Sequence, residues 1–144
     1  MTTMRRKSAA VFSVSSLVTS LLLSLLVFSS ELKVLVPLVV SATVLAGSLG
    51  YIFGDYFSAS GPNSKYKAML LGSAITTATF VVSIVILTVA LKIDSNGTGA
   101  LFQTGDYLSE MVLNIGISGI FSAPILLPLG AFLGVYLNKT RDAG

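Results

Sequence analysis

The sequence predicts an all-α fold, namely a polytopic membrane protein whose four transmembrane helices form an up-down bundle. Of its 144 residues, 53% are hydrophobic and only 10% are charged, whereas soluble domains carry about 25% charged residues. Four windows without charge, at 8–30, 34–54, 68–91 and 111–138, are long enough to cross the roughly 30 Å hydrocarbon core of a bilayer. We therefore expect one membrane domain over 1–144, with spans at 8–30, 34–57, 67–92 and 110–138.

The distribution of Lys and Arg predicts the orientation of these spans. One side of the predicted membrane holds only Lys33 and Lys92 of the nine basic residues. Because segments rich in Lys and Arg stay in the cytoplasm, we expect both termini to be cytoplasmic and the protein to lie in the cell membrane. The basic residues on the cytoplasmic side are Arg5, Arg6, Lys7, Lys65, Lys67, Lys139 and Arg141.

The residue types that most catalytic and cofactor sites need are missing from the sequence. It contains no His and no Cys, which removes the commonest metal ligands, thiolate chemistry and disulfides. No Asp or Glu falls within an uncharged window, which argues against proton-coupled antiport of the small-multidrug-transporter kind. The basic residues follow membrane topology and form no nucleic-acid-binding patch. We therefore expect no catalytic residue, cofactor, metal or nucleic-acid partner.

Small residues recur at helical spacing in every predicted span and mark its packing face. In lipid, helices associate through close backbone approach and hydroxyl hydrogen bonds, so small-xxx-small stripes predict helix contacts. They hold the four helices together, or some of them line a polar channel or contact partner subunits. The hydroxyl-rich stripe of span 8–30 favours water or a partner helix beside it. The predicted packing residues are Ser13, Ser16, Ser20, Ser24, Gly47, Gly50, Gly54, Gly72, Gly116, Gly119, Gly130 and Gly134.

Spans 34–57 and 110–138 both end in the pattern G-x-x-x-G-x-Y, at residues 50–56 and 130–136. The shared ending hints at a duplicated helical hairpin, with both copies in the same orientation.

Three further features of the sequence are candidate sites. Pro124 and Pro128 each remove a backbone hydrogen bond from the last span, which predicts either a static kink or a hinge whose freed carbonyls bind a cation. Asp55 lies at the cytoplasmic boundary near Lys65 and Lys67, and an interfacial ion pair is the expected role. Asn96 begins the sequence Asn-Gly-Thr in the outer loop, which makes it a candidate glycosylation site.

These observations favour a non-enzymatic structural or accessory subunit. We expect it to associate through its Gly, Ser and Ala helix faces with other membrane subunits or with copies of itself, surrounded by the lipid bilayer. The alternative is a small channel or transporter whose pore or site forms at helix interfaces near the Pro124/Pro128 kink. Because four helices leave little interior, we expect such a site to form within an oligomer.

Overall fold

The computed structural model describes residues 2–27, 32–58, 61, 63–96 and 104–140, and every regular element in them is helical. The elements are α1 (Thr2–Val27), α2 (Leu32–Phe53), the short 3₁₀ helix η1 (Gly54–Ser58), α3 (Ser64–Asn96) and α4 (Thr104–Lys139). The expectation of an all-α fold is confirmed for these residues.

Three segments are long and apolar enough to cross a membrane, namely Leu35–Ser58, Ser64–Ile93 and Met111–Lys139. Large apolar side chains cover their outer surfaces, including Val112 and Ile120, which are 69% and 75% exposed. A water-soluble protein does not expose apolar side chains over whole helices, so this chain is embedded in a membrane. Helix α1 is not among the three segments, and its crossing remains a prediction.

The helices extend beyond the predicted spans. Helix α1 begins at Thr2, before its basic cluster, and α3 and α4 exceed the predicted 67–92 and 110–138 at both ends. The long outer loop expected between 92 and 110 is therefore shortened, and only residues 97–103 lie between the two helices. The physical reason is that an uncharged window marks where lipid lies, whereas a helix continues through the headgroup region into water.

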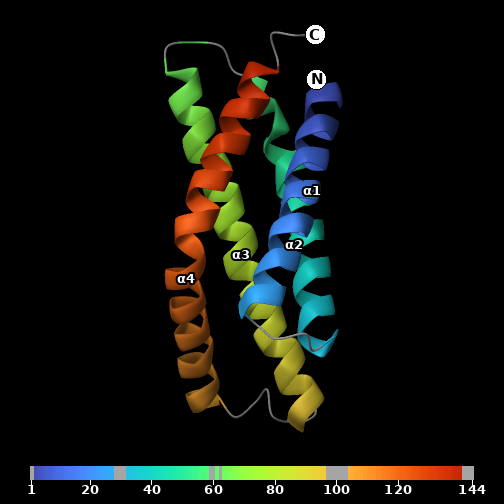
Figure 1. The fold of residues 1–144 in the computed structure, drawn as a ribbon, viewed down its shortest axis with the longest axis vertical. Coiled ribbons are helices and arrows are strands. Elements are labelled where there is room, and N and C mark those ends of the chain that lie inside the picture. The colour runs from blue at the N-terminus through green and yellow to red at the C-terminus, as the bar shows by residue number, and fades with distance from the viewer. Residues whose placement is uncertain (1, 28–31, 59–60, 62, 97–103, 141–144) are drawn as a thin grey trace.

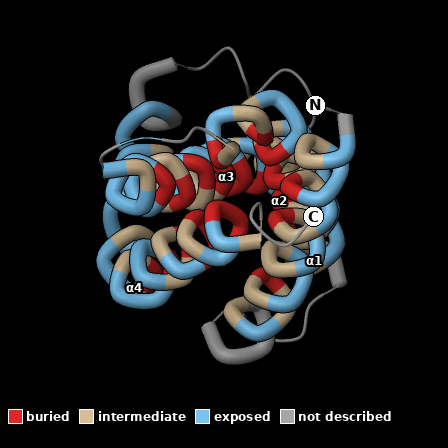
Figure 2. The backbone as a smooth tube through the Cα atoms, turned by 90° about the horizontal axis from the view of Figure 1, so that it is seen from above, coloured by how far each residue is buried: buried red, intermediate tan, exposed pale blue. Residues whose placement is uncertain are grey.

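The helices form two antiparallel hairpins, α1–α2 and α3–α4, which are joined through contacts between α2 and α3 (Figures 1 and 2). Helix α1 begins and α4 ends at the same end of the bundle, which we call the terminal end; the opposite end is the far end. Helices α3 and α4 cross near the terminal end and diverge toward the far end (Figure 1). The first and last helices, α1 and α4, barely touch, so the bundle is open along one side.

Two buried apolar clusters hold the bundle together at different heights. The far-end cluster contains Leu38, Ile84 and Leu87, with Phe80 and Ile115 packed against it. The larger cluster lies toward the terminal end, where the rings of Phe12 and Phe57 are 5.7 Å apart. Its buried members are Phe12, Ala46, Phe57, Ala68, Ile75, Leu133 and Leu137.

Glycines permit the close approach of the helices near the terminal end. A Cβ added at Gly50 would lie 3.0 Å from the Ser8 carbonyl oxygen, and one at Gly54 would lie 2.7 Å from the Arg5 Cα. A Cβ at Gly72 would overlap the backbone of Gly130. Gly134 likewise faces the backbone of Ala68, and Gly47 faces the side chain of Ser13. In both hairpins, therefore, the second helix presents glycines to the first at the same end.

Gly116 and Gly119 differ from these six glycines. A Cβ added at either position would meet no described atom within 4 Å. The packing predicted for these two residues is therefore not made between the described parts of this chain. The reason is the divergence of α3 and α4, which leaves the far half of α4 exposed around most of its circumference.

Candidate binding cavity

A cavity of about 60 Å³ lies between the two apolar clusters, near the middle of the candidate spans. Phe12, Ala46 and Leu133 line its terminal end, and Leu38 and Ile84 line its far end. Because one water needs roughly 10–15 Å³ measured in this way, the space would hold about four waters. The sequence predicted little interior for four helices, but the open side between α1 and α4 leaves this space within one chain.

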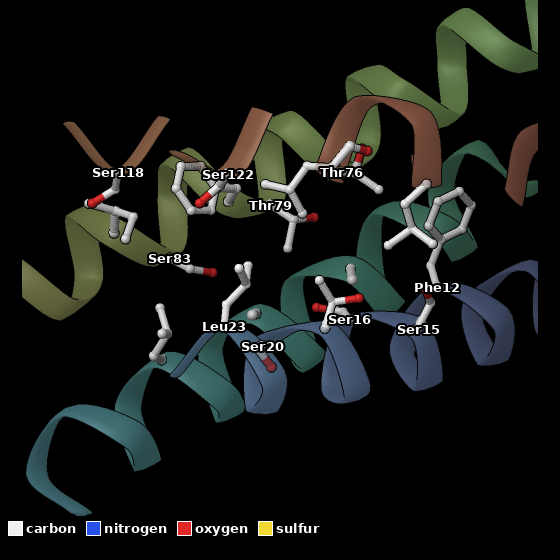
Figure 3. Close-up of a pocket in the computed structure, with 18 of the residues that line it drawn as sticks. Phe12, Ser15, Ser16, Ser20, Leu23, Thr76, Thr79, Ser83, Ser118 and Ser122 are labelled. Carbon is white, nitrogen blue, oxygen red and sulfur yellow. The ribbon is translucent and has the colours of Figure 1, made fainter. Parts of the chain in front are cut away.

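The wall of the cavity is mostly apolar, but three helices contribute hydroxyl-bearing residues to it. Helical spacing of three and four residues brings the hydroxyls of each helix onto one side, and Figure 3 shows Ser16, Thr79, Ser83 and Ser122 on the helices around this space. Helix α2 contributes only apolar residues to the wall. The hydroxyl-bearing residues are Ser15, Ser16, Thr19 and Ser20 of α1, Thr76, Thr79 and Ser83 of α3, and Ser118 and Ser122 of α4. We call this space the hydroxyl chamber.

Two of these hydroxyls are buried without a hydrogen-bond partner in the described part of the chain. They are Thr79 Oγ1 and Ser83 Oγ, on residues that are only 5% and 1% exposed. By contrast, Thr76 Oγ1 donates to the Leu126 carbonyl of α4 at 3.2 Å, and Ser20 Oγ donates to the Leu17 carbonyl at 3.2 Å. A buried polar group without a partner costs about 1–3 kcal/mol. The chamber therefore offers two hydroxyls to any group that can hydrogen-bond with them.

An apolar groove lies beside the chamber, between α1 and α4. This groove of about 780 Å³ shares Ser15, Thr19, Leu23, Leu129 and Leu133 with the chamber wall. Its other lining residues are Ala10, Val11, Val14, Val18 and Leu22 of α1 and Ile125 of α4. We call it the seam groove, and it faces the surroundings of the bundle.

The two prolines of α4 lie next to the chamber without lining it. Helix α4 continues through Pro124 and Pro128, and both residues are exposed on its outer side. Their neighbours Ser122, Leu126 and Leu129 point the other way and line the chamber. The prolines are therefore on the face of α4 opposite the residues that line the cavity.

An ion pair joins α1 to η1 at the terminal end. Arg5 donates from Nε and Nη2 to Asp55 Oδ2, at 2.7 and 2.5 Å, and its guanidinium carbon lies 5.9 Å from the centre of the Tyr51 ring. The hydrogen bond to Asp55 raises the pKa of Arg5 above its ordinary value. The sequence predicted an ion pair for Asp55 near Lys65 and Lys67. The partner is instead Arg5, because the close approach at Gly54 brings the start of α1 beside η1.

The remaining sequence-predicted residues are distributed over the bundle. Ser16 and Ser20 line the chamber, whereas Ser13 donates to the Thr43 carbonyl of α2 at 3.4 Å. The side chain of Ser24 lies outside the described part of the chain. Asn96 is the last residue of α3, and the two residues that follow it in the glycosylation sequence also lie outside the described part. The described residues include no group of three side chains suited to hold a metal ion.

Sequence reasoning did not find the chamber. Thr76, Thr79 and Ser83 form a visible stripe of small residues, but their spacing is the same for a packing face and for a cavity wall. Which hydroxyl reaches a partner depends on how α3 and α4 cross. Comparisons with protein-family models, with curated proteins and with solved structures find no match for this chain.

Proposed function

We propose that the protein is a non-enzymatic small channel or transporter that binds an uncharged polar solute in the hydroxyl chamber. The observation that supports this proposal is that the buried hydroxyls of Thr79 and Ser83 have no hydrogen-bond partner among the described residues. A solute with hydroxyl or amide groups would supply the hydrogen bonds that these side chains lack. The proposal places the site near the Pro124/Pro128 segment but within a single chain.

The chamber wall suits a neutral solute and disfavours an ion. None of its lining residues carries a charge, and a charged group in the middle of a membrane is costly without a partner. Hydroxyls on three helices, interspersed with apolar side chains, suit a small neutral molecule such as glycerol. Passage requires the apolar clusters at the two ends to separate, and a bend of α4 at its prolines would be one way to do so.

The proposal includes four membrane crossings with both termini in the cytoplasm of the cell. It is supported by α1 lying antiparallel against α2, which itself is long enough to span. Helix α1 begins and α4 ends at the same end of the bundle (Figure 1), and six of the eight basic residues in the described part of the chain belong to that end.

Solute uptake by proteoliposomes tests this function. Vesicles that contain the protein should swell faster in a glycerol gradient than protein-free vesicles. The double variant Thr79→Val with Ser83→Ala should reduce this gain in swelling rate. Loss of one neutral hydrogen bond corresponds to about a tenfold reduction. Thr88→Val is the matched control, because the Thr88 hydroxyl bonds to the Ile84 carbonyl of its own helix at 2.8 Å. Equal swelling with and without the wild-type protein would contradict the proposal.

A second candidate function is that of a structural or accessory subunit of a larger membrane complex or homo-oligomer. Most of the small-residue faces are already used within the chain, but Gly116 and Gly119 on the far half of α4 meet none of its described residues. A helix of another subunit or of a second copy could approach there closely. In mild detergent the protein should then migrate above its mass of 15.0 kDa. A monodisperse monomer without any co-purifying protein would exclude this function.

A further inference from the structure

The hydroxyl chamber is flanked along the bundle axis by the two buried apolar clusters, and the seam groove lies beside it. Residues of the two buried apolar clusters line both of its ends. Its residues Ser15, Thr19 and Leu23 are also part of the seam groove. In the proposed arrangement with four crossings, the side between α1 and α4 faces the bilayer, and it is the side on which no buried apolar cluster bounds the chamber among the described residues.

The two connected spaces differ in chemistry. The chamber is small and offers the unpartnered hydroxyls of Thr79 and Ser83. The groove is large and apolar, and its Val14, Val18 and Ile125 are 64%, 49% and 49% exposed. A volume near 780 Å³ lies within the range of about 300–1,000 Å³ typical of ligand pockets. A space that offers two hydroxyls for a head thus adjoins an apolar space for a tail, and the two share Ser15, Thr19 and Leu23 in their walls.

We propose that this composite pocket binds a single-chain, uncharged amphiphile taken from the bilayer, of the chemical class of a long-chain alcohol. The head hydroxyl hydrogen-bonds with Thr79 and Ser83 in the chamber, and the hydrocarbon tail lies in the seam groove. This inference rests on the proposed binding role of the chamber and specifies its ligand and its route of entry.

The size of the chamber selects this occupant over a partner helix. Space for about four waters accommodates a hydroxyl head and the first carbons of a chain, whereas a helix with its side chains is about 10 Å across. A helix seated in the groove would leave Thr79 and Ser83 without a partner. The uncharged wall likewise disfavours an ammonium or phosphate head.

Photocrosslinking in lipid nanodiscs tests the proposal. The probe is hexadecanol with a photoreactive diazirine next to its hydroxyl, and labelled residues are mapped by mass spectrometry. We expect label on the chamber faces of α1 and α3, around Thr19, Thr79 and Ser83. Unlabelled hexadecanol should compete, and hexadecyltrimethylammonium should compete at least about tenfold more weakly because its head is charged. Label spread evenly over all lipid-facing helices would overturn the proposal.

Two kinds of variant locate the head and the tail. The double variant Thr79→Val with Ser83→Ala should lower chamber labelling by about tenfold. Val18→Trp and, separately, Val14→Trp should fill part of the groove and abolish the labelling of the chamber. Val36→Trp is the matched control, since Val36 is 49% exposed on α2 and lines neither space. Helix content and monodispersity in detergent identify any variant that fails to fold.

The outcomes separate this inference from the proposed function. If the groove variants leave labelling unchanged while glycerol uptake still depends on Thr79 and Ser83, the amphiphile site is wrong and the solute-binding function stands. If hexadecanol labels the chamber but glycerol uptake equals that of empty vesicles, the solute-transport function is wrong and the amphiphile site stands. Peptides of another protein crosslinked at Val14 or Val18 would show that a partner helix fills the groove, and would overturn the amphiphile site.

Discussion

At the scale of single residues, two threonines one turn apart on α3 have different environments. The single proton of Thr76 Oγ1 has three carbonyls within hydrogen-bond distance, that of Leu126 on α4 and those of Gly72 and Ser73 on its own helix. Thr79 Oγ1 has no partner among the described residues although it is buried. A threonine thus links two helices at position 76 but carries a hydroxyl without a described partner at position 79.

Replacing each threonine by the isosteric valine should change stability in opposite directions. Thr76→Val removes a cross-helix hydrogen bond, and we expect the free energy of unfolding in lipid to fall by about 0.6 kcal/mol. Thr79→Val removes an unpartnered buried hydroxyl, and we expect a rise of about 1 kcal/mol when no solute is added. Reversible unfolding in mixed micelles measures both. A loss of stability in Thr79→Val equal to that in Thr76→Val would show that the Thr79 hydroxyl has a partner.

The ion pair at the terminal end makes a second prediction at this scale. Both Arg5 hydrogen bonds end on Asp55 Oδ2, whereas Oδ1 is buried without a partner in the described structure. We expect Arg5→Gln and Asp55→Asn to be coupled in a double-mutant cycle, and the coupling to weaken as salt is added, because the pair is partly exposed. Arg6→Gln should show no coupling to Asp55→Asn. Coupling that does not depend on salt would contradict this account of the pair.

At the scale of elements, α4 has two halves with different roles. Its terminal half packs on α3 through Gly130 and Gly134, whereas its far half carries Gly116 and Gly119 in open surroundings. The sequence marks all four glycines in the same way, as small residues on one face of a span. Their difference arises from the angle at which α3 and α4 cross, which is set by the packing of both helices and cannot be read from either alone.

Alanine substitution should distinguish the two halves of α4. A Cβ at Gly130 would lie 2.8 Å from the Ser73 Cα and would also overlap the Gly72 carbonyl, so Gly130→Ala must push α3 and α4 apart. We expect it to lower the free energy of unfolding by about 1–3 kcal/mol. Gly116→Ala should change it by less than about 0.5 kcal/mol, and should reduce co-purification if a partner docks there. Equal losses in both variants would show that the far half packs as tightly as the terminal half.

At the scale of the whole molecule, the sequence predicts what depends on the bilayer and misses what depends on contacts between helices. The uncharged windows locate the helices because a membrane excludes charge along its full thickness. They do not locate helix ends, and α3 and α4 exceed them on both sides. The pairing of Asp55 with Arg5, fifty residues away, and the chamber between α1, α3 and α4 both require knowledge of which helices are neighbours. Nothing local in the chain encodes that α1 and α4 stay apart.

The orientation of the whole bundle and the crossing of α1 can be measured together, because the chain has no cysteine. Single substitutions Thr3→Cys, Lys65→Cys, Lys139→Cys and Leu108→Cys place a thiol at exposed positions, three at the terminal end and one at the far end. A membrane-impermeant maleimide on intact cells should label Leu108→Cys at once and the other three only after permeabilisation.

Each departure from this labelling pattern has a distinct structural meaning. Immediate labelling of Thr3→Cys, with Lys65→Cys and Lys139→Cys still protected, would mean that α1 does not cross and that only three helices span. A complete reversal would invert the bundle and contradict the orientation that Lys and Arg predict. If α1 does not cross, the seam groove between α1 and α4 would no longer lie within the bilayer. The expected pattern is therefore also a condition for ligand entry from the bilayer, because only an α1 that spans beside α4 places the groove in contact with lipid.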